Sequence, residues 1–251
     1  MTDGLTPTLT TVSREDVANS VLRMLSLCRV CATRHVARFY EHTTRPSIRA
    51  REVMHYLHER DYIEFYRAGM NKQAIYRLSK RIRKQYGIIP VNWNSSVMEH
   101  RLAVTDVYMD LGEPETFIAE YRSEYEWRGR RHVLSPDVYT EVKLPKGISE
   151  LYTLDSNEGP NSTRTLGNQE TSHGMFIEVQ RTPIESKRWA EKRMQYENYF
   201  ASGMWKQEFE AKPVVVVVMS EPQMSETIGS PIGYEMYVVR HIGEVIEKWG
   251  S

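Results

Sequence analysis

The chain has 251 residues, of which 40% are hydrophobic and 26% charged, a globular composition with room for two modest domains. The longest apolar run, Val214 to Met219, is too short to cross a bilayer, and residues 1–12 lack the apolar segment of a secretory signal. With only two cysteines, these features predict a cytoplasmic protein that has neither a membrane segment nor a disulfide framework.

The net charge of zero conceals two parts of opposite charge. Residues 1–96 carry 16 Lys and Arg against 8 Asp and Glu, whereas residues 97–251 carry 17 against 25. This asymmetry predicts two domains with different partners. The basic part is the better candidate for binding a polyanion, because Lys and Arg release counterions from DNA phosphates. Solvated helix faces explain many carboxylates of the acidic part, and a metal site explains a few.

After a flexible tail at residues 1–12, residues 13–86 predict three short helices and a hairpin. Ser13 is the expected N-cap of the first helix and Thr33 that of the second. Ser47 starts the third helix, in which Ile48 is expected to face inward. Two β-like runs follow, at residues 62–67 and 73–78. This is the element order of a winged helix, whose third helix enters the major groove of DNA.

Polar and basic residues lie where such a domain contacts double-stranded DNA. They are Arg45, Ser47, Arg49, Arg51 and His55 at the third helix, and Arg67 and Lys72 at the wing. A charged helical domain that binds protein is the alternative. The basic stretch 79–86 is either a phosphate contact or a solvated helix end, and residues 87–96 are the predicted linker.

Residues 97–251 predict an α/β domain with a mixed sheet. A helix at 97–111 precedes one or two strands within 117–127 and a strand at 138–144, and residues 146–174 form a polar, mobile loop. The rest of the predicted elements are a strand at 175–180, a helix at 183–200, a buried strand at 214–219, a strand at 235–239 and a helix at 242–249. The run Arg128 to Arg131 is either a hairpin tip or a phosphate contact.

Acidic residues at the ends of two of these strands suggest a chemical site. Asp137 begins one strand and Glu178 lies on the next, so both are candidate ligands of Mg²⁺, which takes one or two carboxylates with water and phosphate oxygens. Gln180 follows on the same strand face because side chains alternate with period two. Lys192, on the following helix, completes the candidate catalytic set.

The acidic motif resembles the PD-(D/E)XK nuclease pattern, in which the last position is usually Lys, whereas this chain has Gln180. The order of elements resembles the plasmid replication-relaxation family: a winged helix, the segment from His100 through Asp106, a strand bearing Glu124, then the motifs at Asp137 and Glu178. The resemblance implies an α+β protein, with an N-terminal winged helix-turn-helix and a restriction-endonuclease-like domain with a mixed central sheet. It also implies a DNA-binding protein of a plasmid, phage or integrative element, acting in replication or mobilisation. Asp106 and Glu124 are second-tier site residues.

Two other functions remain open. One is a transcriptional or replication regulator whose nuclease-like domain is inactive and serves dimerisation, which makes a homodimer a candidate state. The other is an accessory protein of a relaxosome-like or replication assembly. No zinc is expected at Cys28 and Cys31, which lie at a helix end without a second cysteine pair.

Overall fold

The computed structural model describes residues 13–66, 73–89, 91, 95–143, 172–181, 186–219 and 233–250. The chain forms two compact units, Met1–Thr105 and Asp106–Ser251. The boundary falls inside helix α5 (Ser95–Asp110), so this one helix contributes residues to both units. The predicted tail at residues 1–12 lies outside the described residues, as do Arg67 and Lys72.

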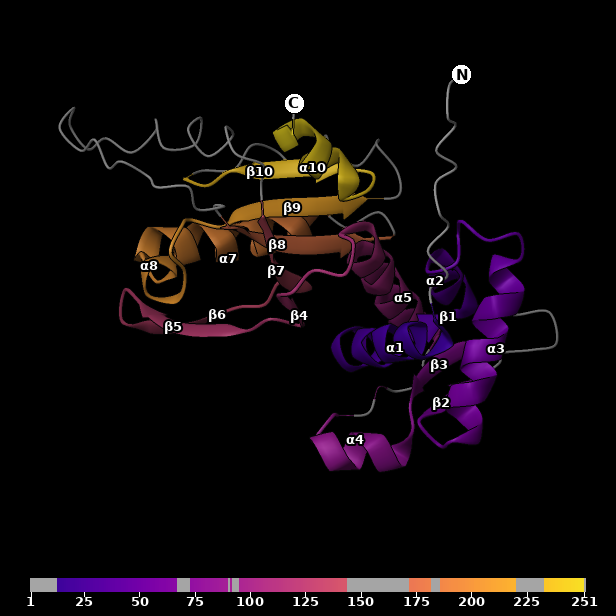
Figure 1. The fold of residues 1–251 in the computed structure, drawn as a ribbon. Helices are drawn as coiled ribbons and strands as arrows, with labels where there is room; N and C mark the ends of the chain where they lie inside the picture. Colours follow the sequence, from indigo (N-terminus) through magenta and orange to yellow (C-terminus); the bar gives the residue numbers. More distant parts are fainter. Residues whose placement is uncertain are drawn as a thin grey trace, which may run out of the picture. The chain divides into compact units, whose positions relative to one another are not determined.

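The first unit combines helices with a small antiparallel sheet. Its elements before α5 are α1 (Arg14–Cys28), β1 (Cys31–Ala32), α2 (Thr33–Arg38), α3 (Pro46–Glu59), β2 (Ile63–Tyr66), β3 (Ile75–Leu78) and α4 (Lys80–Tyr86). The strands pair in the order β1-β3-β2, with both pairs antiparallel (Figure 1). Nothing in this order conflicts with the predicted winged helix, although the two-residue strand β1 was not predicted.

Helix boundaries in the first unit follow from capping chemistry. The Ser13 hydroxyl accepts a hydrogen bond from the backbone N–H of Asp16 at the start of α1, as predicted. Ser79 caps α4 in the same way, and Gly87 ends that helix in the left-handed conformation that glycine tolerates. In α3, Val53 and Leu57 are buried as expected.

Ile48 departs from the expected pattern of α3. Its side chain was predicted to face inward, but it is 46% exposed. The buried residues of the helix are Ala50, Val53, Met54 and Leu57. The first turn of α3 therefore places Ile48 with its polar neighbours Ser47 and Arg49 on the exposed surface.

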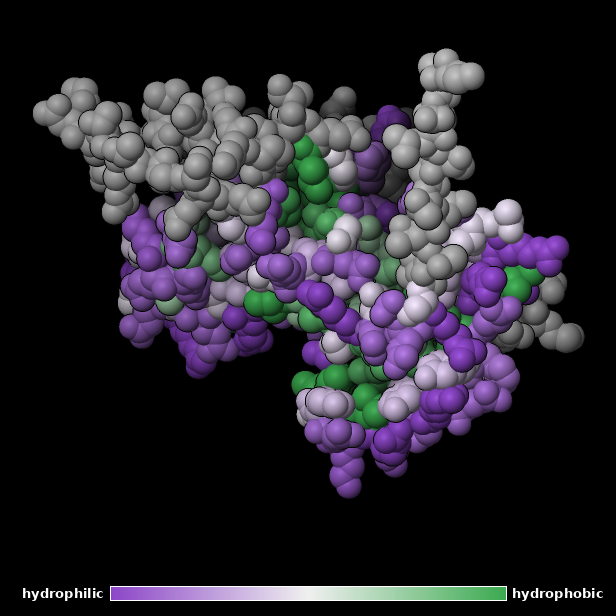
Figure 2. All heavy atoms as spheres, viewed as in Figure 1, coloured by the Kyte–Doolittle hydropathy of each residue, from purple (hydrophilic) through white to green (hydrophobic). Residues whose placement is uncertain are grey.

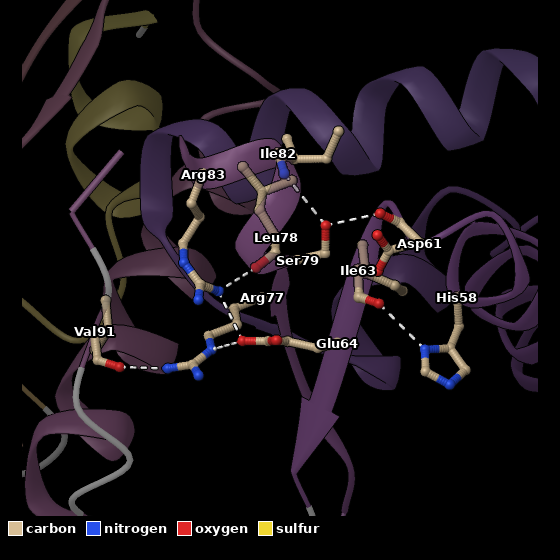
Figure 3. A network of polar contacts seen from close by, with 10 residues as sticks. All are labelled: His58, Asp61, Ile63, Glu64, Arg77, Leu78, Ser79, Ile82, Arg83 and Val91. Atoms are coloured by element: carbon tan, nitrogen blue, oxygen red, sulfur yellow. Dashed lines mark hydrogen bonds and ion pairs between the residues drawn. The ribbon is translucent and has the colours of Figure 1, made fainter. Parts of the chain in front are cut away.

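An ion-pair network joins the hairpin of the first unit to α4 (Figure 3). The Glu64 carboxylate on β2 accepts hydrogen bonds from Arg77 Nε (2.5 Å) and Arg83 Nη1 (2.7 Å). Arg77 also donates to the backbone carbonyl of Val91 (2.6 Å), and Arg83 donates to that of Leu78. Arg83 belongs to the basic stretch 79–86, so this arginine serves an internal contact in the structure.

The second unit is built on a five-stranded mixed sheet. After α5, its elements are β4 (Phe117–Ala119), β5 (Ser123–Trp127), β6 (Arg130–Leu134), β7 (Val138–Lys143), β8 (Ser172–Gln180), α7 (Ser186–Ser202), α8 (Trp205–Glu208), β9 (Val214–Met219), β10 (Met236–Val239) and α10 (Gly243–Gly250). The large sheet has the order β10-β9-β8-β7-β4, and β5 and β6 form a separate hairpin (Figure 1). The fold is thus α+β with a mixed central sheet.

Helix α7 covers one face of this sheet. Strand β7 runs antiparallel to β8, and β8 runs parallel to β9. Phe176 of β8 and Val215 of β9 share one apolar core with Tyr196 and Phe200 of α7 and with Leu134 of the hairpin. The even-numbered positions of β8 therefore face α7, and the hairpin packs into the same core.

Two segments of the second unit, the predicted loop 146–174 and strand β6, were not fully predicted from the sequence. Residues 172–174 of the predicted loop 146–174 belong to strand β8. The other residues of that loop, 146–171, lie outside the described residues. Strand β6 was not predicted, because its sequence Arg130-Arg-His-Val-Leu134 lacks the alternation of polar and apolar residues expected of a strand. The Arg128 to Arg131 run does form a hairpin tip.

Candidate functional site

Three predicted site residues meet where β7, β8 and α7 come together. Asp137 immediately precedes β7, Glu178 lies near the end of β8, and Lys192 lies in the second turn of α7. Val138 pairs with Ile177, so the antiparallel register brings Asp137 beside Glu178. Lys192 approaches Glu178 from the helix above this face, with 3.0 Å between Nζ and Oε1.

Asp137 is held by backbone contacts. Its Oδ2 accepts a hydrogen bond of 2.7 Å from the N–H of Val179, one residue after Glu178. Its own backbone carbonyl accepts one of 2.7 Å from the N–H of Glu120. These contacts hold Asp137 against β8 before the regular pairing of β7 with β8 begins.

Glu178 is a buried carboxyl with an altered acidity. Its side chain is 2% exposed. Burial, the largest influence, raises its pKa, and the nearby charge of Asp137 acts in the same direction. The Lys192 ammonium and the Tyr196 hydrogen bond oppose this, and the resulting pKa is about 7. Glu178 consequently exchanges its proton near neutral pH, which is uncommon for a glutamate and frequent at functional sites.

Lys192 and Tyr196 lie four residues apart on α7 and so share one helix face. The Tyr196 hydroxyl donates to Glu178 Oε1, and the Lys192 ammonium also donates to the backbone carbonyl of Ser135 (2.5 Å). The sequence identified Lys192 as a candidate and placed Tyr196 in line with it on the helix, but assigned Tyr196 no role.

The other predicted site residues lie outside the contacts that join Asp137, Glu178 and Lys192. Gln180 is half-buried one alternation beyond Glu178 on the same face of β8, and its side chain makes no hydrogen bond or ion pair with any residue that the structure describes. Asp106 lies on α5 and is also half-buried. Glu124 lies on the exposed side of the hairpin, where Arg122 and Arg131 pair with it, so it is not a member of this cluster.

The two carboxylates fit a hard divalent cation in type and number. Within the described ranges, no three His, Cys, Asp or Glu side chains gather into a metal-binding group. Two carboxylates nevertheless suffice for Mg²⁺, because water and phosphate oxygens complete its octahedral shell. Since Glu178 has a pKa near 7, a proton would compete with any cation that binds there.

The predicted DNA-contacting residues of α3 are all exposed, and three of them, Ser47, Arg51 and His55, recur at four-residue spacing on one side of the helix. Arg45 flanks the helix as its N-cap residue, and all of the predicted helix contacts are exposed: Ser47, Arg49, Arg51 and His55. Two of them have acidic neighbours, because Arg49 lies 3.7 Å from Glu52 and His55 lies 3.3 Å from Glu59. Exposed pairs of this kind are weak, so they give way readily to a phosphate.

The family comparison covers both units. The model of the replication-relaxation family matches residues 22–215, which is most of the chain and includes α3, Asp137, Glu178 and Lys192. The chain belongs to the replication-relaxation family. This membership supports a role in the replication of plasmids or other mobile elements. No curated protein and no solved structure matches the chain at the significance threshold used.

Partners of this family member are correspondingly expected to include DNA and replication proteins. A search of the described helices for a span able to cross a membrane found none of sufficient length and apolar character.

Proposed function

We propose that this replication-relaxation protein binds duplex DNA of a plasmid, phage or integrative element through its first unit, and nicks that DNA with its second unit in the presence of Mg²⁺. The observation that carries the proposal is the meeting of Asp137, Glu178 and Lys192 at the ends of β7 and β8. In this proposal the protein acts in replication or mobilisation, either alone or with relaxosome or replication proteins.

DNA binding by the first unit is supported by the winged-helix order of its elements and by the surface of α3. Ser47, Arg51 and His55 are exposed on one side of the helix, Arg49 is exposed beside Glu52, and Arg45 is the N-cap residue. Hydroxyl, guanidinium and imidazole groups bind phosphates and base edges in the major groove. Ile48, exposed among them, adds an apolar side chain of the kind that contacts thymine methyl groups.

Each residue of the second unit has a distinct part in the proposed cleavage. Asp137 and ionised Glu178 hold the cation, which supplies an activated water and neutralises charge on the scissile phosphate. Lys192 places a positive charge beside the same phosphate, the part that Lys has in the PD-(D/E)XK pattern at the position of Gln180. Tyr196 positions Glu178 by its hydrogen bond.

A second candidate function is supported by two features of the same site. Gln180 stands where the pattern usually has Lys, and the Lys192 ammonium already binds Glu178 and the Ser135 carbonyl. An ammonium held in this way neutralises a buried carboxylate without any metal. In this alternative the protein is a DNA-binding transcriptional or replication regulator, and its nuclease-like unit is inactive and serves dimerisation.

Nicking of supercoiled plasmid separates the two functions. Wild-type protein with Mg²⁺ or Mn²⁺ is expected to convert supercoiled plasmid into the open circular form, and Asp137→Asn and Lys192→Met are expected to abolish this. Arg240→Ala, which changes an exposed arginine elsewhere in the second unit, is the matched control and is expected to retain wild-type activity.

Absence of nicking in wild type, with duplex binding intact, would support the regulator. Nicking that persists in both site variants would place the activity elsewhere or in a contaminant. Thermal unfolding of each variant at the assay pH excludes loss of activity through loss of fold.

A further inference from the structure

The β5–β6 hairpin is basic, whereas the second unit as a whole is acidic. Residues 106–251 carry 16 Lys and Arg against 24 Asp and Glu, whereas the segment 121–134 carries four arginines against two glutamates. A basic segment in an acidic unit points to a negatively charged partner. Figure 2 shows a strongly hydrophilic surface where Figure 1 places this hairpin.

The hairpin is fixed to the body of the unit along its inner side. Tyr125 and Leu134 are buried, and the Tyr125 ring packs edge-on against Tyr199 of α7 with 5.5 Å between ring centroids. The turn is tight, because Trp127 pairs with Arg130 and only two residues separate them. Both turn residues, Arg128 and Gly129, have positive φ, as a type I′ turn requires. The tip therefore holds its charges on a rigid support.

The arginines of the hairpin are presented outward. Arg128 lies over the Trp127 ring, 5.5 Å from its centroid, and Arg130 is exposed beside it. In the described part of the chain, neither forms an ion pair. One carboxylate, Glu124, binds both Arg122 and Arg131, whose side chains are 62% and 74% exposed, against 36% for Glu124. The carboxylate thus orients two guanidinium groups without neutralising both.

We propose that the tip of the β5–β6 hairpin binds the phosphate backbone of DNA, as a second contact surface separate from α3. Planar guanidinium groups donate paired hydrogen bonds to phosphate oxygens. This inference rests on the DNA binding proposed above and extends it to the second unit.

The position of the hairpin relates this contact to the candidate site. Strand β6 continues into Ser135, whose carbonyl binds Lys192, and then into Asp137. Arg131 lies four positions before Ser135, which is about 13 Å along an extended strand. Phosphates of one DNA strand follow each other at about 3.4 Å along the helix axis, so the hairpin binds the backbone about four nucleotides from the site.

A charge-reversal pair tests the proposal on the full chain. Binding of a fluorescein-labelled duplex is followed by anisotropy over roughly 50 to 200 mM salt. Arg130→Glu is expected to weaken binding by roughly fivefold or more and to lower the slope of log affinity against log salt by about one for the lost phosphate contact. Arg240→Glu carries the same charge change on an exposed residue of the same unit and is expected to stay within about twofold of wild type.

Equal effects of the two variants, or none from either, would overturn the hairpin contact while leaving DNA binding by α3 intact. Wild-type protein that fails to bind duplex even at low salt would overturn the DNA-binding function itself. Matching thermal unfolding curves for both variants show that the comparison reports on contact and not on fold.

Discussion

Glu64 in the first unit and Glu178 in the second are both glutamates on strands that bind cationic side chains, but their acidities shift in opposite directions. Burial raises the pKa of each. At Glu64, hydrogen bonds from Arg83 and Arg77 outweigh burial and lower the pKa below its usual value. At Glu178, one ammonium from Lys192 does not outweigh complete burial and the adjacent Asp137, and the pKa rises to about 7.

The difference shows how a structural ion pair and a reactive carboxyl arise from similar residues. Glu64 has two guanidinium partners and a side chain that is 35% exposed, so its charge is fully matched (Figure 3). Glu178 has less cationic support and no access to bulk water, so its charge depends on pH and on any added cation. The first arrangement stabilises the β2–β3 hairpin, and the second gives a carboxyl whose charge changes near neutral pH.

Removal of Lys192 is expected to have the largest effect on stability. Lys192→Met leaves a buried carboxylate without its counter-ion, so the free energy of unfolding should fall by about 3 kcal/mol at about pH 8. The loss should be smaller at about pH 5, where Glu178 is protonated. Chemical denaturation at both pH values measures it. The double variant with Glu178→Gln should recover most of the loss, and failure to recover would show that Lys192 acts through other contacts.

The pH dependence of wild-type stability comes next. The folded-state pKa of Glu178 lies above its value of 4.5 in the unfolded chain. Between about pH 4.5 and 7 the native state therefore binds more protons, and stability falls as pH rises, by about 3 kcal/mol in total. Glu178→Gln should remove this part of the slope. An unchanged slope in the variant would contradict the raised pKa.

Glu64→Gln should have a smaller effect with the opposite pH dependence. Its pKa is lowered, so its stabilisation is present above about pH 4.5 and is lost as pH falls through the folded-state value. The variant should lose about 2 kcal/mol at neutral pH, less than a fully buried pair because solvent screens the exposed carboxylate. Denaturation of wild type and variant near neutral pH and near pH 3 should give a difference that shrinks in acid. A constant difference would contradict the ion-pair explanation.

The smallest effect is expected from Tyr196→Phe, which removes one hydrogen bond to Glu178. The loss should be about 1 kcal/mol. Tyr125→Phe is the matched control. Among the residues that the structure describes, the hydroxyl of this buried tyrosine makes one long hydrogen bond, of 3.4 Å, to the Gln195 carbonyl. Equal losses in the two variants would show that the Tyr196 hydroxyl does not contribute through Glu178.

The sequence predicted strand bounds and helix caps correctly where the local signals were strong. The strand from Val214 to Met219 has the predicted bounds because five consecutive valines permit little else, and Ser13 caps α1 as expected. Asp137 and Glu178 were identified because they lie at the ends of predicted strands, and Lys192 because it lies on the helix that follows. The spacing of 41 residues between the two acids gave no support by itself.

Contacts between residues that are distant in the chain could not be predicted from the sequence. Nothing in the local pattern indicates that Glu64 binds Arg83, or that Glu124 binds Arg131 on the exposed side of a hairpin. Ile48 was expected to face inward with the other apolar residues of its helix, yet the first turn of α3 exposes it. Each of these outcomes depends on tertiary packing, which periodicity does not encode.

Binding of Mn²⁺ to the full chain, measured by isothermal titration calorimetry at about pH 6 and about pH 8, tests the central claim most directly. Ionisation of a carboxyl with a pKa of about 7 should strengthen binding by about tenfold between these pH values. Asp137→Asn should weaken binding at both, and Arg240→Ala should bind as wild type. Absence of binding at both pH values, or binding that Asp137→Asn leaves unchanged, would contradict a metal site at Asp137 and Glu178.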